Sequence, residues 1–514
     1  MNCPKDTPVD AERRKLLALA AALSVTRMAY AKPKTHAGVP EICALDAVSL
    51  SAAIHGRRLS CAEVMTAYLD HIERINPKVN AIVALQARDE LLRQAREHDD
   101  LLARGNSFGV LHGFPHAVKD LQPVKGIVST QGSPIFKDFI PKAEGLMVER
   151  LRKAGAIFIG KTNTPEFGLG SHTYNPVYGA TRNAYDPTRS AGGSSGGAAV
   201  GLALRMLPVA DGSDYGGSLR NPSGWNNVYG FRTSFGCVPN DAKDEWLPSM
   251  GVVGPMARNV QDLAMLLSVQ AGYDARAPLS VLADGSRFTH RLERDFKGTR
   301  IAWCRDFKGQ VPHDPEVLKT CEAALKTFES LGCVVEETSP EYSIPQVWEA
   351  LVNLRGWQMG AGLYELYQDP SKRTLLKPEA VFEIETGLRL SAYDISHAST
   401  VRTQFTQAAQ KLLARYDYLL VPTASVFPFP VEQHWPQVVA GTRMNTYHEW
   451  MMGTFLITMT GMPALAAPAG FSSAGLSMGL QIVANHHEEL KCLELAQAYE
   501  LASRHQERLP ALLT

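Results

Sequence analysis

The chain has 514 residues, of which 45% are hydrophobic and 20% are charged, and this composition is typical of a globular protein. Glycine (41 residues) and proline (31 residues) are too few for a low-complexity chain, which excludes disorder, collagen and coiled coil for the whole sequence. Lys and Arg (52) balance Asp and Glu (52), so no net positive field favours a general nucleic-acid binder.

Residues 13–31 have the three-part pattern of a secretory signal peptide. A basic start at Arg13-Arg14-Lys15 is followed by the apolar run 16–25 and by the cleavage pattern Ala29-Tyr30-Ala31. The run is too short to span a membrane, and the adjacent arginines suggest twin-arginine export. We therefore expect a signal peptide at residues 1–31 and a periplasmic or secreted protein. The alternatives are an amphipathic first helix of the mature fold and, without cleavage, a cytoplasmic protein.

Helix and strand patterns alternate along the rest of the chain. A capping box at Ser60–Glu63 opens a helix with one apolar face, which stops at Asn76-Pro77. The following patterns predict a strand at 79–85, a helix at 89–104, a strand at 114–119, a helix at 145–154 and a strand at 156–160. Asp314-Pro315 opens another helix that stops at Gly332, and a strand follows at 333–337.

This alternation predicts an α/β layered fold around a mostly buried sheet. No internal repeat or composition shift divides the sequence, so residues 32–514 are expected to form a single domain. The eight cysteines include no C-x-x-C pair, and we expect scattered core cysteines rather than a zinc site or a disulfide framework.

Two loops rich in Gly and Ser, at 190–200 and 211–224, predict a site lined by backbone. The motifs are compatible with three kinds of chemistry. Gly155–Thr162 matches the phosphate-loop pattern G-x-x-x-x-G-K-[ST] with Lys161, but its four middle residues look like a strand rather than a loop. The serine elbow G-x-S-x-G fits residues 192–196, although the segment before it is turn-like where that elbow needs a strand.

The third possibility pairs serines with a lysine. Lys119 ends the predicted buried strand, and burial lowers the pKa of an ammonium group toward the range of a general base. Ser218 follows two glycines, so the N–H groups of its own loop could converge on an oxyanion. Ser194 lies between these two residues in the sequence.

These segments resemble the amidase signature family. The likeness is carried by LHGFPHAVKD at 111–120, by LRKAGAIFIGKTNTPEF at 151–167, by the two serine loops and by the closing block that begins TGMPALAAPAGF at 460. It covers roughly residues 45–500, with several long motifs in the family's order. The resemblance implies the amidase signature fold, in which helices cover both faces of a central mixed β-sheet.

The resemblance also implies a Ser–cis-Ser–Lys triad and a serine amidohydrolase of the EC 3.5.1 type. Ser218 would be the nucleophile, Ser194 the bridging serine after a cis bond to Gly193, and neutral Lys119 the base. Backbone N–H groups of Tyr215, Gly216, Gly217 and Ser218 would form the oxyanion hole. Matching positions that would support the triad are Ser195, Asp214 and Arg220.

The sequence departs from the family pattern at Tyr215, where threonine or isoleucine is common, and at Ala198, His116 and Leu121. These departures bear on the choice of substrate. Aromatic residues that could line an apolar cleft are Trp348, Trp357, Tyr364, Tyr367, Trp435 and Trp450.

We expect a small-molecule amide substrate, no cofactor, no metal, no nucleic acid and no membrane span, and we allow for a homodimer. The alternatives are a subunit of the glutamine amidotransferase type, a nucleotide-binding protein that uses Lys161, and an inactive binding protein on the same scaffold.

Overall fold

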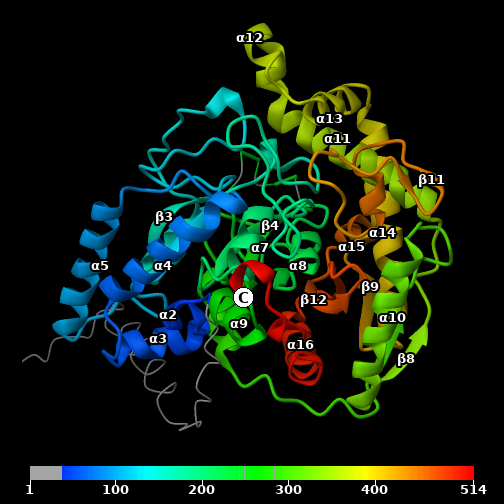
Figure 1. Cartoon of the computed structure of the whole chain (residues 1–514). Helices are drawn as coiled ribbons and strands as arrows, with labels where there is room; N and C mark the ends of the chain where they lie inside the picture. The colour runs from blue at the N-terminus through cyan, green and yellow to red at the C-terminus, as the bar shows by residue number, and fades with distance from the viewer. Residues whose placement is uncertain (1–37, 242, 245, 248, 283) are drawn as a thin grey trace, which may run out of the picture.

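The computed structural model describes residues 38–514 except 242, 245, 248 and 283 (Figure 1). The predicted signal peptide at 1–31 lies outside the described residues and stays a prediction. In the part of the chain that is described, no helix is long and apolar enough to cross a membrane.

The first helices are α2 (Glu41–Ala44), α3 (Ala47–His55), α4 (Cys61–Ile75) and α5 (Arg88–Ala103). The predicted capping box starts α4: the Ser60 hydroxyl accepts the Glu63 N–H, and the Glu63 carboxylate accepts the Ser60 N–H. Residues 79–85 were expected to form one strand, but only β1 (Ile82–Val83) is extended in a sheet. Asn80 and Ala84 have φ of 54° and 48°, and such left-handed residues break a strand on both sides.

A small sheet carries the lysine block. Its order is β1, β3 (Ile157–Thr162) and β2 (Pro115–Lys119), with β2 and β3 parallel. The helix before β3 is α6 (Leu146–Lys153). Every residue of β2 and β3 is buried, as the apolar runs predicted, and β2 ends at Lys119.

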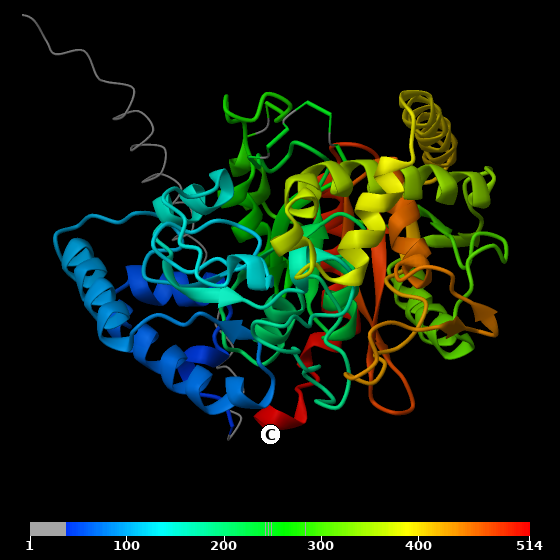
Figure 2. The ribbon, with the colours of Figure 1, turned by 90° about the horizontal axis from the view of Figure 1, so that it is seen from above.

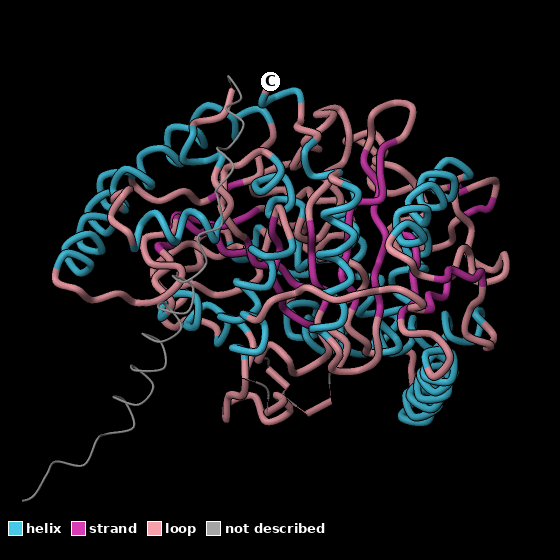
Figure 3. Tube along the Cα trace, turned by 90° about the horizontal axis from the view of Figure 1, so that it is seen from below, coloured by secondary structure: helices cyan, strands magenta, loops and turns pink. Residues whose placement is uncertain are grey.

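A second, mixed sheet has eight strands. In spatial order they are β4 (Ala210–Asp214), β6 (Val252–Ala257), β5 (Tyr229–Arg232), β12 (Ala464–Phe471), β13 (Ser477–Val483), β9 (Tyr418–Pro422), β7 (Arg300–Trp303) and β8 (Val334–Glu337). Neighbours are antiparallel from β4 to β9 and parallel from β9 to β8. Figure 3 shows these strands running through the middle of the molecule, with helices around them.

Helices flank this sheet, which confirms the predicted mixed α/β fold. Those packed on its strands are α7 (Gly196–Ala203), α8 (Arg220–Trp225), α9 (Val260–Gln270), α10 (Pro315–Ser330), α15 (Met452–Thr460) and α16 (Glu489–Ser503). At one corner lie α11 (Ile344–Gln368), α12 (Pro370–Arg373), α13 (Pro378–Leu388) and α14 (Ala392–Leu413) (Figures 1 and 2). A short hairpin joins β10 (Val438–Val439) to β11 (Thr442–Arg443). The seven cysteines among the described residues are buried and unbridged, in agreement with the sequence.

Candidate active site

Lys119 ends β2 with its side chain wholly buried. Its Nζ lies 2.7 Å from Ser194 Oγ, 2.9 Å from Ser195 Oγ and 3.0 Å from Ser213 Oγ, and it also donates to the Ser213 carbonyl at 3.3 Å. Burial lowers the pKa of Lys119 to about 7, while the carboxylates of Asp211 and Asp214 act in the opposite direction. The amine is thus poised to exchange a proton with a serine near neutral pH.

Ser194 sits in a hydrogen-bonded loop that begins with Gly192. The Gly193–Ser194 peptide bond is cis, as the family resemblance implies. The Ser171 hydroxyl donates to the Gly193 carbonyl at 2.6 Å, and Thr173 donates to the Gly192 carbonyl through its N–H and its hydroxyl. These bonds fix the backbone on which Ser194 faces Lys119.

Ser218 follows the second glycine pair and precedes α8. Its loop is joined to that of Ser194, because the Ser195 N–H donates to the Ser218 carbonyl at 3.2 Å. Ser218 is 8% exposed, whereas Ser194 is 2% exposed, so Ser218 is the more accessible of the two. Its hydroxyl has no hydrogen bond to any described residue. The structure therefore brings all three predicted triad residues into one region.

The loop 215–218 is held from two sides. The Asp214 carboxylate accepts the Gly217 and Leu219 N–H groups at 3.0 Å, and the Thr454 hydroxyl donates to the Gly216 carbonyl at 2.6 Å. Because the Gly217 N–H already donates to Asp214, it is not available as the oxyanion-hole donor that the sequence predicted. The N–H groups of the other three predicted donors, Tyr215, Gly216 and Ser218, have no acceptor among the described residues.

Tyr215 is the residue at which the loop departs from the family pattern, and its side chain points away from the loop. Its hydroxyl donates to Gln358 Oε1 at 2.9 Å, and the Arg355 guanidinium lies 4.9 Å from the ring centre. Arg355 in turn pairs with Glu383 at 2.6 Å. The larger side chain is thus accommodated by α11 and α13.

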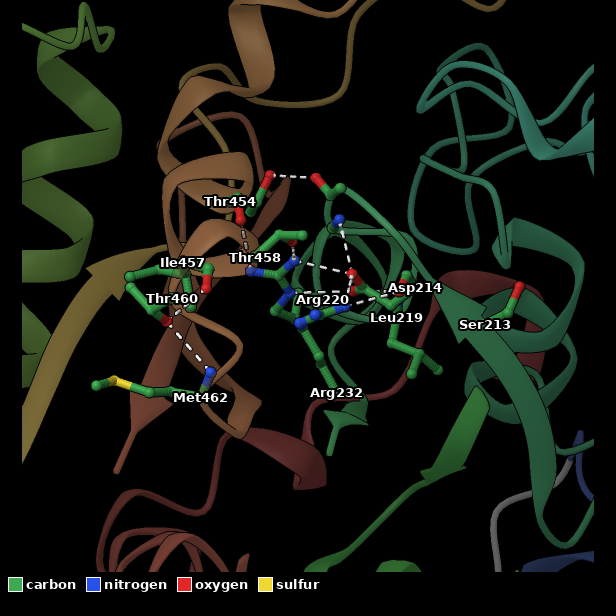
Figure 4. Close-up of polar contacts among 12 residues, drawn as sticks. Ser213, Asp214, Leu219, Arg220, Arg232, Thr454, Ile457, Thr458, Thr460 and Met462 are labelled. Carbon is green, nitrogen blue, oxygen red and sulfur yellow. Dashed lines mark hydrogen bonds and ion pairs between the residues drawn. The ribbon is translucent and has the colours of Figure 1, made fainter. Parts of the chain in front are cut away.

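A buried ion cluster supports the loop (Figure 4). Arg220 donates to both carboxylate oxygens of Asp214, at 2.8 and 3.0 Å, and Arg232 adds a third contact at 3.4 Å. Burial alone would raise the pKa of Asp214, but these two arginines hold it well below its usual range. Arg220 also donates to the Thr454 carbonyl and the Thr458 hydroxyl, so it connects the loop to α15.

Sequence reasoning missed two contributors to this site. Ser213 offers both its hydroxyl and its carbonyl to Lys119, and Thr454 holds Gly216. Ser213 stands directly before Asp214 in the signature, so its place in the motif was a usable signal. Thr454 lies far along the chain and has no local pattern that marks it.

Residues 63–493 match the sequence profile of the family described as Amidase. The chain belongs to this family.

Similar proteins and solved structures support this family assignment. An acylamidase from Rhodococcus erythropolis is 33% identical over 471 residues, which cover 91% of this chain and 97% of that protein. A glutamyl-tRNA(Gln) amidotransferase subunit from Thermosynechococcus vestitus is 32% identical over 479 residues, with 88% and 97% covered. The crystal structure of a bacterial aryl acylamidase of the amidase signature family is similar with a TM-score of 0.84 and 28% identity, with 90% and 98% covered.

In this amidase the loop beside Ser194 continues into a small apolar cluster, called here the apolar wall. A methyl group on Gly168 would lie 3.4 Å from Ser194 Oγ, so the loop 166–170 passes directly over that hydroxyl. Leu169 on the same loop belongs to a small hydrophobic cluster, separate from the main core. Its other buried members, from the link between α12 and α13 and from α13 itself, are Leu376, Ala380 and Ile384.

The aromatic residues proposed from the sequence do not gather in one cleft of the amidase. Tyr367 packs against the apolar wall, whereas Trp450 is buried and stacks on Trp225 with ring centres 5.7 Å apart. Trp348 packs edge-on against Phe455, beside the loop 215–218. Ordinary core packing therefore accounts for Trp450.

The phosphate-loop match has a structural explanation. Its last six residues form β3, so the segment cannot cradle a phosphate. Lys161 is buried and donates to the Gln122 carbonyl and the Ser129 hydroxyl, and it lies 3.8 Å from Asp120. No group of three or more His, Cys, Asp or Glu within the described ranges is placed to hold a metal ion.

Proposed function

We propose that this amidase hydrolyses the C–N bond of carboxylic acid amides through an acyl-enzyme on Ser218. The observation that carries the proposal is the 2.7 Å approach of a buried lysine with a lowered pKa to the hydroxyl of Ser194. A lysine so placed serves as a base at neutral pH, and membership of the amidase family supports this use.

In the acylation step Lys119 begins as a neutral amine. It takes the proton of Ser194, which takes the proton of Ser218, and Ser218 Oγ forms a bond to the carbonyl carbon of the amide. The negative charge that develops on the carbonyl oxygen would be stabilised by the N–H groups of Tyr215, Gly216 and Ser218. Collapse of this intermediate breaks the C–N bond, and the proton held by Lys119 returns through Ser194 to the leaving nitrogen.

In the second step water attacks the ester on Ser218 and releases the carboxylic acid. The same lysine and bridging serine remove a proton from water and return it to Ser218. Ser195 supports the relay through its hydrogen bond to Lys119, and Asp214 with Arg220 fixes the loop that carries the nucleophile.

We propose apolar acyl or aryl amides as the substrate class. The loop over Ser194 continues into the apolar wall of Leu169, Leu376, Ala380 and Ile384, which suits a hydrophobic group. An acylamidase and an aryl acylamidase are among the similar proteins, which supports this choice.

A second candidate is glutamine hydrolysis of the amidotransferase type, since subunits of that enzyme are also about one-third identical. Glutamine carries a free ammonium and a free carboxylate, which need charged partners. The charged residues beside the apolar wall already have partners. Lys377 pairs with Glu379 at 3.6 Å and donates to the Leu169 carbonyl. Glu166 accepts the Ser133 hydroxyl, and Glu383 pairs with Arg355. Because these charged groups are already paired, the site favours an apolar substrate over glutamine.

The test is the release of amine or ammonia from a panel of alkyl amides, anilides, peptide amides, carbamates and glutamine. Wild type should turn over the anilides and apolar amides, and Ser218→Ala should lose at least about 10⁴-fold of that activity because triad members act as a unit. The control is Ser268→Ala, because the Ser268 hydroxyl donates to the Met265 carbonyl and to no other described residue. Turnover that survives in folded Ser218→Ala would reject the assignment, and preferential hydrolysis of glutamine would favour the second candidate.

We further propose export to the periplasm or out of the cell, on the strength of the basic, apolar and A-x-A pattern at 13–31. Cell fractionation with N-terminal sequencing of the mature chain tests this, and an intact N-terminus in the cytoplasm would contradict it. The homodimer that we allow for is tested by light scattering of the purified protein.

A further inference from the structure

A buried histidine–carboxylate pair lies beside the base of the triad. Asp211 on β4 and His116 on β2 are both fully buried, and His116 Nε2 lies 2.9 Å from Asp211 Oδ1. The backbone N–H of Lys119 donates to the same carboxylate, at 3.2 Å to Oδ2. Asp211 therefore contacts the lysine's own backbone as well as the histidine three residues before it.

The geometry fixes the charge of the pair. His116 Nδ1 is buried and has no hydrogen-bond partner among the described residues, so a proton there would be an unsatisfied buried donor. The neutral tautomer with its proton on Nε2 avoids this cost and donates to an ionised Asp211. The pair as a whole then carries one negative charge.

The two carboxylates near Lys119 differ in their surroundings. Asp214 is in contact with two guanidinium groups, Arg220 and Arg232, which more than neutralise it. Asp211 has only His116 within ion-pair distance in the described part of the chain. It is thus the carboxylate near the lysine that no Lys or Arg side chain contacts among the described residues.

Other titratable groups around the pair are few. Burial lowers the pKa of Lys161 on β3 to about 8, while Asp120, at 3.8 Å, and Asp211 act in the opposite direction. Of the other elements packed on β2 and β4, α7 and β6 carry no titratable side chain. The third such element, α4, contributes the buried groups Cys61, Tyr68 and His71, none of which bonds to Asp211.

We propose that Asp211, kept ionised by His116, is the counter-charge for the ammonium that forms on Lys119 during acylation. The inference rests on the proposed function of Lys119 as the base. The proton moves from Ser218 to Ser194 and from Ser194 to the lone pair of Lys119, and the pair exchanges no proton. Asp211 and His116 are positioning residues: they stabilise the charged lysine and hold β2 in register.

The sign of the effect follows from this charge. A fixed negative group favours the ammonium, so its removal lowers the pKa of Lys119 below the value of about 7 that it has in the intact protein. For unit charges roughly 6 to 10 Å apart at an effective dielectric constant of about 20, the change amounts to about 1 to 2 pH units.

The experiment measures kcat/KM from pH 4 to 10 for wild type and Asp211→Asn, beside the rate at which phenylmethylsulfonyl fluoride labels Ser218. In Asp211→Asn the acid limb of both profiles should move down by about 1 to 2 pH units, and the rate at the plateau should fall at least about tenfold. A role limited to folding would lower the amount of active enzyme and leave the position of the limb unchanged.

Variants of His116 test the second half of the inference. His116→Val removes the donor to Asp211, so the buried carboxyl becomes neutral and the limb should move in the same direction. His116→Gln keeps an N–H donor and should retain the wild-type limb. His71→Gln, a change at another buried histidine that bonds to a backbone carbonyl, is the matched control and should also leave the limb in place.

The outcomes separate the inference from the proposed function. A wild-type acid limb in folded Asp211→Asn and His116→Val, with activity still dependent on Ser218, overturns the counter-charge and leaves the amidase mechanism intact. Activity that survives in Ser218→Ala overturns the mechanism itself. A limb that moves in the Asp211→Asn and His116→Val variants but not in His116→Gln or His71→Gln supports the inference.

Discussion

Replacing Gly217 with alanine tests whether the loop 215–218 must keep its exact path. A methyl group at this position would lie 2.6 Å from the hydroxyl oxygen of Thr454 and 2.9 Å from its Cβ. Ordinary van der Waals contacts begin at about 3.4 Å, so the loop 215–218 and the helix α15, which carries Thr454, must separate by about 0.8 Å. The φ of 126° at Gly217 adds strain, because a side chain rarely adopts it.

This displacement acts on the hydroxyl that holds the Gly216 carbonyl. A shift of nearly 1 Å in a group that positions the reacting atoms costs about 10²-fold in rate. We therefore expect kcat for Gly217→Ala to fall about 100-fold, while overpacking and strain cost about 2 to 4 kcal/mol of stability. Steady-state amine release and urea unfolding measure the two effects.

The control is Gly251→Ala. Its methyl group would meet its nearest neighbour, a carbon of the Tyr215 ring, at an ordinary 3.7 Å, so kcat should stay within about twofold. If folded Gly217→Ala kept more than a third of wild-type kcat, the reasoning that ties this loop's position to catalysis would fail.

Three further predictions concern pH and stability. Since the pKa of Lys119 is about 7 and we propose its neutral amine as the base, kcat/KM should rise with pH through a limb centred near 7 in a buffer series from pH 5 to 10. Asp214→Asn should lower the free energy of unfolding by about 3 kcal/mol in urea titrations, since two buried arginines lose their counter-charge. Because the folded pKa of Asp214 lies below its unfolded value of about 3.9, this stability is present above about pH 4 and is lost as the pH falls, so the variant should lose less stability in acid than wild type does. Ser60→Ala should cost about 1 kcal/mol through loss of the cap on α4, with kcat unchanged, as a thermal melt and a rate assay would show.

Local sequence signals predicted the elements that carry the site. The apolar run before Lys119 predicted a buried strand, and β2 ends at that residue. The capping box at Ser60 predicted the start of α4. The strand expected at 79–85 shrank to two residues because Asn80 and Ala84 adopt left-handed backbone that no local pattern marks.

Long-range contacts were beyond sequence reasoning alone. Lys119 and Ser194 are 75 residues apart, and it was the family resemblance, not spacing, that paired them before the structure placed them 2.7 Å apart. His116 was noted only as a departure from the family pattern that bears on the substrate. Its partner Asp211 lies 95 residues away on another strand, so the pairing shows only when the sheets are assembled.

The bonds of Arg220 to α15 have a consequence for how the enzyme comes into being. Its partners Thr454 and Thr458 are made 234 and 238 residues after it, and Thr454 also holds the loop that carries Ser218. A ribosome that has built β2 and both serine loops has made all three side chains of the proposed triad, yet the chain still lacks α15, which holds the loop in place. Hydrolytic activity should therefore appear only late in synthesis, after residue 458 has left the ribosome, and contacts of such long range should make folding slow.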